Sequence, residues 1–230
     1  MRTPRALELL DTWEAVSGSN PLAQAVALLR LVDETETPEG LPIGARDAAL
    51  FGLRQELFGR MIDATATCPG CGETLQVAFT ADDVVSGEGA SERTVTSPDG
   101  RRLTLRPVTS ADLAAVVGQP MSAARSRLAE RCAGVDIGEL DSAAVDIVVE
   151  ALADLDPDAD LLFDLGCEAC AHRWPAVFDI GSYLWSELGR WIQRLLLDVH
   201  VLAATYGWTE EQVLALTPWR RQAYVEMASR

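Results

Sequence analysis

Two Cys-x-x-Cys motifs constrain the fold of this chain more than any other feature of its sequence. They contain four of its five cysteines, namely Cys68, Cys71, Cys167 and Cys170. The two thiolates of such a motif come from one tight turn, and two turns that face each other complete the tetrahedral four-sulfur shell of a structural zinc site. The sequence therefore predicts that these four cysteines bind one Zn²⁺ ion.

The residues that follow the two motifs are also similar. A shift of 99 residues places Cys68, Cys71, Leu75 and Phe79 on Cys167, Cys170, Trp174 and Phe178. Residues 75–79 alternate in the manner of a strand, and a second strand is expected through Ala176 to Phe178. We expect the two halves to form the hairpins of a zinc ribbon. Because such a site ties together segments far apart in the sequence, its expected role is structural.

A pair of disulfides and a thioredoxin-like redox site are the alternative roles for these cysteines. The N-terminal residues do not resemble a signal peptide, and Cys-x-x-Cys pairs in a reducing cytosol more often hold a metal. A redox motif opens a helix, whereas both motifs here run into strand-like residues. The fifth cysteine, Cys132, is expected to be a partly buried helix residue. His172 is expected beside the ligands or at the surface.

The charge balance limits the partners of the protein. Of its 230 residues, 35 are acidic and 19 are basic, which gives a net charge of −16. This charge disfavours binding to nucleic acids and to anionic membranes. No apolar run approaches the roughly 18 residues that a membrane span needs. We therefore expect a folded, cytoplasmic protein with no nucleic-acid partner and no membrane span.

Hydrophobic periodicity predicts an α+β fold that is mainly helical, with the small zinc ribbon and one further hairpin. The helices expected before the last third are residues 4–17, 21–32, 45–63, 110–118, 121–133 and 142–155. The third of these carries Leu50, Leu53, Leu57, Phe58 and Met61 at helical spacing. The additional hairpin is expected around the turn Ser97–Gly100. Ser110, Ser122 and Asp141 occupy positions typical of helix N-caps.

The C-terminal third has the strongest helical pattern. Its apolar residues recur every three or four positions, at Leu184, Leu188, Trp191, Leu195, Val199 and Leu202. This spacing predicts one helix over residues 182–206, with Arg190, Gln193, Arg194 and Asp198 on the other side. Two short helices are expected after Gly207. We divide the chain into an N-terminal helical segment (1–44), a zinc-ribbon region with inserted helices and a hairpin (45–181), and the C-terminal helices (182–230).

No motif of a common catalytic site occurs in the sequence. It lacks a glycine-rich phosphate loop, a Gly-x-Ser-x-Gly elbow and a His-Glu-x-x-His motif. Residues 154–160 carry an aspartate at every second position, but they lack the glycine and the glutamate that a calcium loop requires. We expect a solvated acidic loop at this segment, and a protein that is not an enzyme.

Several segments together resemble the family of T-even-type phage baseplate proteins and baseplate hub assembly chaperones. These segments are Ala45–Gly59, Cys68–Glu73, Cys167–Cys170 with Arg173–Trp174, Tyr206–Glu210, Leu214–Thr217 and Trp219–Arg221. The resemblance covers roughly residues 45–228, and members of the family occur in contractile-tail phages and phage-tail-like injection systems. It implies a non-enzymatic hub component or assembly factor. It also implies hub or spike proteins as partners, and a place in the cytoplasm or in a phage-tail-like particle.

A stand-alone zinc-ribbon adaptor, for example in transcription, is the alternative function. In either case the C-terminal segment is the candidate partner surface, through Trp208, Trp219, Arg220, Arg221 and Tyr224. Trp, Tyr and Arg dominate the binding energy of many protein interfaces. The alternative for these residues is that the aromatic rings pack on the long helix while the arginines pair with nearby acids.

Overall fold

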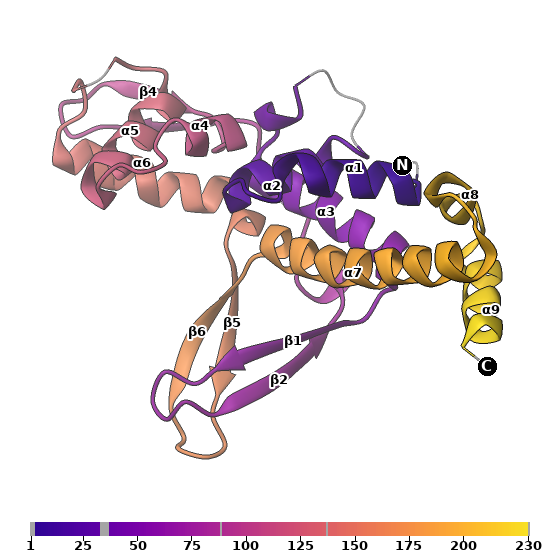
Figure 1. Ribbon diagram of the computed structural model, residues 1–230. Helices are drawn as coiled ribbons and strands as arrows, with labels where there is room; N and C mark the ends of the chain where they lie inside the picture. The colour runs from indigo at the N-terminus through magenta and orange to yellow at the C-terminus, as the bar shows by residue number, and fades with distance from the viewer. Residues whose placement is uncertain (1–2, 33–36, 88, 137, 230) are drawn as a thin grey trace.

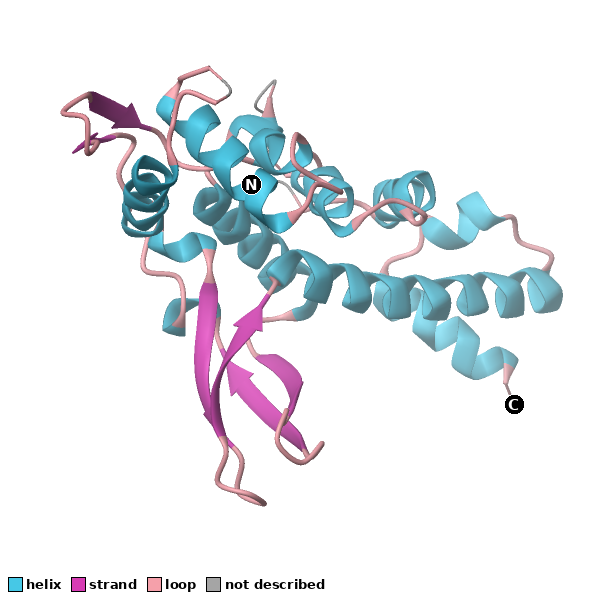
Figure 2. Cartoon of the chain, turned by 90° about the vertical axis from the view of Figure 1, so that its left-hand side faces the viewer, coloured by secondary structure: helices cyan, strands magenta, loops and turns pink. Residues whose placement is uncertain are grey.

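The computed structural model describes residues 3–32, 37–87, 89–136 and 138–229 (Figures 1 and 2). Its central layer consists of α1 (Ala6–Val16), α2 (Pro21–Leu29), α3 (Ile43–Phe58) and α7 (Ile180–Tyr206). Two hairpins project from one side of this layer and form an arm, and a smaller lobe adjoins one end (Figure 1). The helices α8 (Glu210–Leu214) and α9 (Pro218–Ala228) lie at the far end of α7. The prediction of a mixed, mainly helical α+β fold is confirmed.

The arm consists of two equivalent antiparallel hairpins. The first pairs β1 (Ile62–Thr67) with β2 (Thr74–Phe79), and the second pairs β5 (Leu161–Gly166) with β6 (Arg173–Phe178). Their registers coincide after the shift of 99 residues, since Ile62 faces Phe79 and Leu161 faces Phe178. The preceding helices start at the same shift, α3 at Ile43 and α6 (Ser142–Leu155) at Ser142. The similarity seen around the cysteines therefore extends to a whole helix–hairpin unit.

The first strand of each hairpin was not predicted from the sequence. The third predicted helix ends at Phe58 and not at residue 63, because Gly59 has a φ of 90° that a helix cannot continue. Met61 was predicted to belong to this helix, but it lies outside it and is 54% exposed. Leu50 and Leu53 are buried as predicted. The two expected hairpins are therefore present, but only their second strands, β2 and β6, had been located in the sequence.

The helix α7 forms the spine of the molecule. The Asp179 carboxylate caps its start by accepting hydrogen bonds from the N–H groups of Gly181 and Ser182, and Gly207 ends it with a φ of 67°. Four predicted core positions, Leu184, Leu188, Leu195 and Leu202, are buried, while Trp191 and Val199 are half-buried. On the other side Arg190, Gln193 and Arg194 are exposed. Asp198, also expected on this side, is half-buried because it forms an ion pair with Arg221 of α9.

The main core lies between α7, the other central helices and the base of the arm. Its largest fully buried side chains include Leu28, Leu29, Leu50, Leu53, Ile62, Ile180, Leu184, Leu188 and Ile192. The helices α2 and α7 approach closely at Gly181, where an added Cβ would lie 3.0 Å from the Ala25 Cβ. The rings of Trp13 and Trp185 stack beside this core with centroids 6.4 Å apart. These contacts fix the base from which the arm projects.

The smaller lobe has its own core around α5 (Met121–Ala133), α6 and a third hairpin. This hairpin, β3 (Arg93–Thr96) with β4 (Arg102–Leu105), turns at residues 97–100 as predicted. The helix α4 (Ser110–Ala114) is shorter than expected. It is capped by Thr109 and not by Ser110, and Pro120 precedes α5 where Ser122 was expected as the cap. Asp141 caps α6 as predicted, by accepting from the Ala144 N–H.

The acidic segment 154–160 is not the solvated loop that was expected. Asp156 is buried and accepts a hydrogen bond from the Gly44 N–H at 3.0 Å. Asp158 is buried as well and accepts from Ser86 and from the Gly87 N–H. The two carboxylates therefore fasten the end of α6 to α3 and to the chain that follows β2.

The predicted domain boundaries, after residues 44 and 181, both fall inside helices, the first in α3 and the second in α7. The same two helices contribute to the main core together with α1 and α2.

No helix in the described part of the chain is both long enough and apolar enough to cross a membrane.

Asp112 is the centre of a buried polar cluster in the smaller lobe. Burial acts to raise its pKa, but hydrogen bonds from Arg106, Thr109 and Arg131 outweigh this effect and hold the pKa well below its usual range. The Arg131 Nε lies 2.8 Å from the carboxylate. A carboxylate with a lowered pKa contributes stability above its unfolded pKa of about 3.9, and the contribution is lost as the pH falls below that value.

We expect Asp112→Asn to lower the free energy of unfolding by about 1–3 kcal/mol at pH 7, because charge-assisted hydrogen bonds to a buried group are lost while the arginines still reach water. Chemical denaturation at pH 7 and at about pH 2.5 measures the effect. The difference in unfolding free energy between variant and wild type should be smaller at the lower pH, which lies below the unfolded pKa. Asp146→Asn removes an exposed partner of Arg125 and is the matched control. Equal losses in the two variants would contradict the prediction.

Candidate metal centre

Each hairpin of the arm turns through one Cys-x-x-Cys motif. In the first turn the Cys68 N–H donates to the Glu73 carbonyl at 2.8 Å, and the Gly72 N–H donates to the Cys68 carbonyl at 2.9 Å. The second turn makes the same two hydrogen bonds at the positions shifted by 99 residues, at 2.9 and 2.8 Å. The two turns therefore present their cysteines in the same local geometry.

The two turns differ at one backbone position. Gly72 has a φ of 80°, and the equivalent residue is Ala171 with a φ of 58°. Ala171 is the one residue other than glycine with a positive φ in the described part of the chain. A side chain in this conformation is unfavourable by about 1–2 kcal/mol. The backbone of the second turn is thus held in a shape that its own sequence disfavours.

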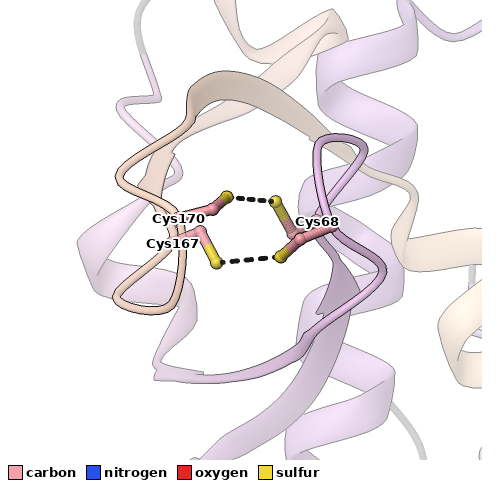
Figure 3. A group of neighbouring side chains, drawn as sticks. Cys68, Cys167 and Cys170 are labelled. Atoms are coloured by element: carbon pink, nitrogen blue, oxygen red, sulfur yellow. Dashed lines mark hydrogen bonds between the residues drawn. The ribbon is translucent and has the colours of Figure 1, made fainter.

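The sulfur atoms of both motifs converge between the hairpins (Figure 3). All four lie within 4.8 Å of one another. The Sγ atoms of Cys68 and Cys170 are 3.6 Å apart, and so are those of Cys71 and Cys167. A tetrahedral ion with bonds of about 2.3 Å to sulfur places its ligands roughly 3.8 Å apart, whereas a disulfide requires about 2.05 Å. All four predicted ligands are therefore brought together at metal-binding distances, with no disulfide between them.

The electrostatics of the cluster follow from four thiols in contact. Burial acts to raise the pKa of Cys68, but the N–H groups of Gly70 and Cys71 and the neighbouring sulfurs lower it to about 7. The Cys71 thiol accepts from the Glu73 N–H, yet the sulfurs of Cys170 and Cys167 raise its pKa to about 12. One thiolate forms readily, and the next is opposed by the charge of the first. A cation between the sulfurs is needed to keep all four deprotonated.

The surroundings of the cysteines are small and partly open to solvent. Cys68 and Cys167 are buried, while Cys71 and Cys170 are exposed. A Cβ at Gly70 would lie 3.2 Å from the His172 side chain and 3.5 Å from the Cys170 sulfur, so the two turns are in direct contact there. His172 stacks on Trp174 with ring centroids 5.9 Å apart, at the surface and outside the sulfur cluster.

Phenylalanines join the two hairpins at the opposite end of the arm. The equivalent residues Phe79 and Phe178 meet edge to face with centroids 5.0 Å apart, and Phe163 lies 4.7 Å from Phe79. These rings pack on the main core. The arm is therefore held by apolar contacts at its base and by the cysteines at its tip.

The C-terminal candidate residues divide into buried and exposed groups. Trp208 and Tyr224 are half-buried and meet edge to face at 4.9 Å, with Tyr206 beside them. Arg221 is buried and pairs with Asp198 of α7 at 3.2 Å, which is the local pairing that was the alternative for the arginines. Trp219 is 79% exposed, and Arg220 is exposed as well.

The fifth cysteine lies in a helix, as predicted, but it is fully buried where partial burial was expected. Cys132 is buried in α5, and burial together with the Asp112 charge raises its pKa to about 11. The sequence analysis did not predict that the two turns touch at Gly70 or that Ala171 has a positive φ. The positive φ of Ala171 could have been predicted, because the shift of 99 residues aligns Ala171 with Gly72 in a tight turn.

Comparison with known proteins adds no further assignment. No protein-family model matches the chain, and no curated protein and no solved structure matches it. The metal centre is therefore interpreted from its own geometry, namely four cysteine sulfurs from two equivalent turns.

Proposed function

We propose that the four cysteines bind one Zn²⁺ ion whose role is structural. The observation that carries this proposal is the convergence of four sulfurs within 4.8 Å at the tip of the arm. Four thiolates complete the tetrahedral shell, which leaves no open position for a substrate, as is typical of structural zinc sites. Iron also accepts four thiolates. Elemental analysis of the purified protein distinguishes the two metals, and we expect about one zinc per chain.

For the biological role, we propose a non-enzymatic component or assembly factor of the baseplate hub in a contractile tail or injection particle. This assignment rests on the sequence resemblance described above, namely the order of cysteine motifs, long helix, Tyr-Gly-Trp and Trp-Arg-Arg. A metal that fixes a projecting arm is consistent with a protein that acts by binding other proteins. The partners on this proposal are hub or spike proteins, and the protein is cytoplasmic before it enters a particle.

A zinc-ribbon adaptor outside any particle remains the second candidate. The two candidates share a protein-binding surface and differ in the assembly that contains it. Purification of assembled particles, followed by detection of this chain, separates them. Its presence at a fixed ratio to hub proteins identifies a resident component, and its presence only in assembly intermediates identifies an assembly factor. Its absence from both favours the adaptor.

The exposed residues Trp219 and Arg220 are the part of the C-terminal segment that is available to a partner. We expect the double variant Trp219→Ala, Arg220→Glu to reduce co-purification with the hub about tenfold or more, because such residues dominate interface energies. Zinc content and melting temperature should change little, since exposed substitutions usually alter stability by less than about 0.5 kcal/mol. Arg221 is left unchanged because its loss would leave the half-buried Asp198 carboxylate without its ion-pair partner.

The matched control is Met121→Ala, Arg102→Glu, which makes similar changes at exposed positions of the smaller lobe. Met121 is 84% exposed. This control should co-purify with the hub at the wild-type level. Normal co-purification of the Trp219, Arg220 variant would show that the partner surface lies elsewhere on the molecule.

A further inference from the structure

One face of α7 remains uncovered between the arm and α9. Both the arm and α9 lie on the same side of α7, near its two ends (Figure 1). Toward the arm, the Tyr183 hydroxyl of α7 donates to the Asp63 carbonyl of β1 at 3.0 Å. Toward α9, Asp198 pairs with Arg221. Between these anchors α7 presents Arg190 and Arg194, which are exposed, and Leu197, which is 61% exposed.

The acidic residues nearest to these two arginines on the helix have other partners. Glu187 lies one turn before Arg190, and it receives two hydrogen bonds from the buried Arg54 guanidinium, at 2.9 and 3.1 Å. Asp198 lies one turn after Arg194 and forms an ion pair with Arg221. Arg190 and Arg194 therefore have no free carboxylate on their own helix. Asp63 of β1 lines the same cavity, but it forms no ion pair with either arginine.

Neither arginine has an ion pair or hydrogen bond with any residue that the structure describes. Most of the described arginines pair with a carboxylate, and Arg102, Arg127 and Arg220 are the others that do not. The chain has 35 acidic residues and 19 basic ones, all of which are arginines. Two like charges spaced four residues apart on a helix also destabilise it slightly, by about 0.2–0.5 kcal/mol. The local structure thus leaves two cations uncompensated within an acidic molecule.

A cavity of about 310 Å³ lies beside the two arginines. It is lined by Arg54, Phe58, Asp63, Tyr183, Glu187, Arg190 and Arg194. Since Asp63 belongs to β1 and Phe58 to α3, the cavity lies where the arm joins the helical layer. A side-chain carboxylate is small enough for this space and would find two guanidinium groups that can each donate two hydrogen bonds.

We propose that this face of α7 binds an acidic segment of a partner protein, with glutamate or aspartate carboxylates on Arg190 and Arg194 and an adjacent apolar side chain on Leu197. We choose an acidic segment as the partner because its carboxylates are complementary in charge to the two unpaired arginines. Nucleic acid is disfavoured, because its binding needs many cations along successive phosphates, and this face offers two unpaired arginines beside Asp63 and Glu187. The proposal rests on the protein acting by binding other proteins, and it does not depend on the baseplate assignment.

The test uses the full-length, metal-loaded protein and two fluorescein-labelled peptides. One peptide consists of Leu-Glu-Glu repeats, and the other has glutamine in place of every glutamate. Fluorescence anisotropy at low and at physiological ionic strength measures binding. We expect saturable binding of the glutamate peptide that weakens with salt, and at least tenfold weaker binding of the glutamine peptide.

Two double variants locate the binding site. Arg190→Glu, Arg194→Glu should weaken binding of the glutamate peptide by roughly tenfold for each arginine. Arg102→Glu, Arg127→Glu makes the same change of net charge in the smaller lobe, at arginines that also have no partner among the described residues. This control should retain binding near the wild-type level. Arg190→Lys, Arg194→Lys keeps the charge but loses the planar donor geometry, and it should give an intermediate affinity.

The remaining outcomes each overturn the proposal. These are no saturable binding of the glutamate peptide, equal binding of the glutamine peptide, or equal weakening in both glutamate double variants. Full competition by inorganic phosphate would identify a general anion site. Light scattering measures whether the protein self-associates. Self-association that is lost in the double variant Arg190→Glu, Arg194→Glu would show that a second copy of the chain binds this face. Absence of the protein from baseplate particles would refute the baseplate role and leave the peptide result unchanged.

Discussion

Replacement of Cys68 or Cys170 by serine is expected to remove the metal and unfold the arm. The two residues come from different turns, and their sulfurs are 3.6 Å apart. The apparent binding free energy of a structural zinc site reaches about 10–16 kcal/mol in small domains, and much of it is folding free energy. Elemental analysis should show a fall from about one zinc per chain to almost none. Hydrogen exchange should show lost protection in β1, β2, β5 and β6, with aggregation on warming.

Cys132→Ser is the matched control, because Cys132 is buried but lies outside the metal centre. It should keep its metal and the protection of the arm. Chelator should reproduce the effect of the ligand variants in the wild-type protein. Full thermal stability in excess chelator, in a sample with no detectable zinc, would show that the phenylalanines at the base hold the arm without a metal.

The second large effect is expected in the core beneath α7. Leu188 is fully buried against the central helices, and Leu195 is buried two turns further along. Truncation of either to alanine should lower the free energy of unfolding by about 2–5 kcal/mol, because apolar contacts are lost and a cavity remains. Chemical denaturation of the metal-loaded protein measures this loss.

Gln193→Ala is the control on the same helix, since the Gln193 side chain is exposed and forms no hydrogen bond with any residue that the structure describes. Its effect should stay within about 0.5 kcal/mol. A larger loss for Gln193→Ala than for Leu188→Ala would contradict the assignment of the buried face.

The metal centre could be predicted from the sequence because its signal is local. Each Cys-x-x-Cys turn is complete within a few residues, and the shift of 99 residues aligns the turns and the strands after them. The first strand of the first hairpin was missed for a physical reason. Residues 62–67 carry small alanines on their inner face, and they follow a helix whose apolar spacing continues to Met61. The glycine at residue 59 is the signal that could have ended that helix earlier.

Long-range polar contacts could not be predicted in the same way. Arg54 reaches Glu187, which lies 133 residues further along the chain. Arg221 and Asp198 are closer in sequence, yet their pairing depends on how α9 folds back on α7. Each of these residues is charged, and a charged side chain is expected to be exposed to solvent. Which of them become buried is decided only when helices pack, and this also determines which arginines remain without a partner.

The cysteine cluster also has a consequence for the denatured chain. Its contacts join residues that are 96 and 102 positions apart, and the whole smaller lobe lies within that interval. A chain that unfolds while it retains the metal would remain a closed ring of about 100 residues, for which the loss of chain entropy corresponds to roughly 4–5 kcal/mol. This quantity varies only with the logarithm of ring size, and doubling the ring adds about 0.6 kcal/mol. The lobe can therefore gain or lose residues between the two hairpins with almost no change in the entropic effect of the cross-link.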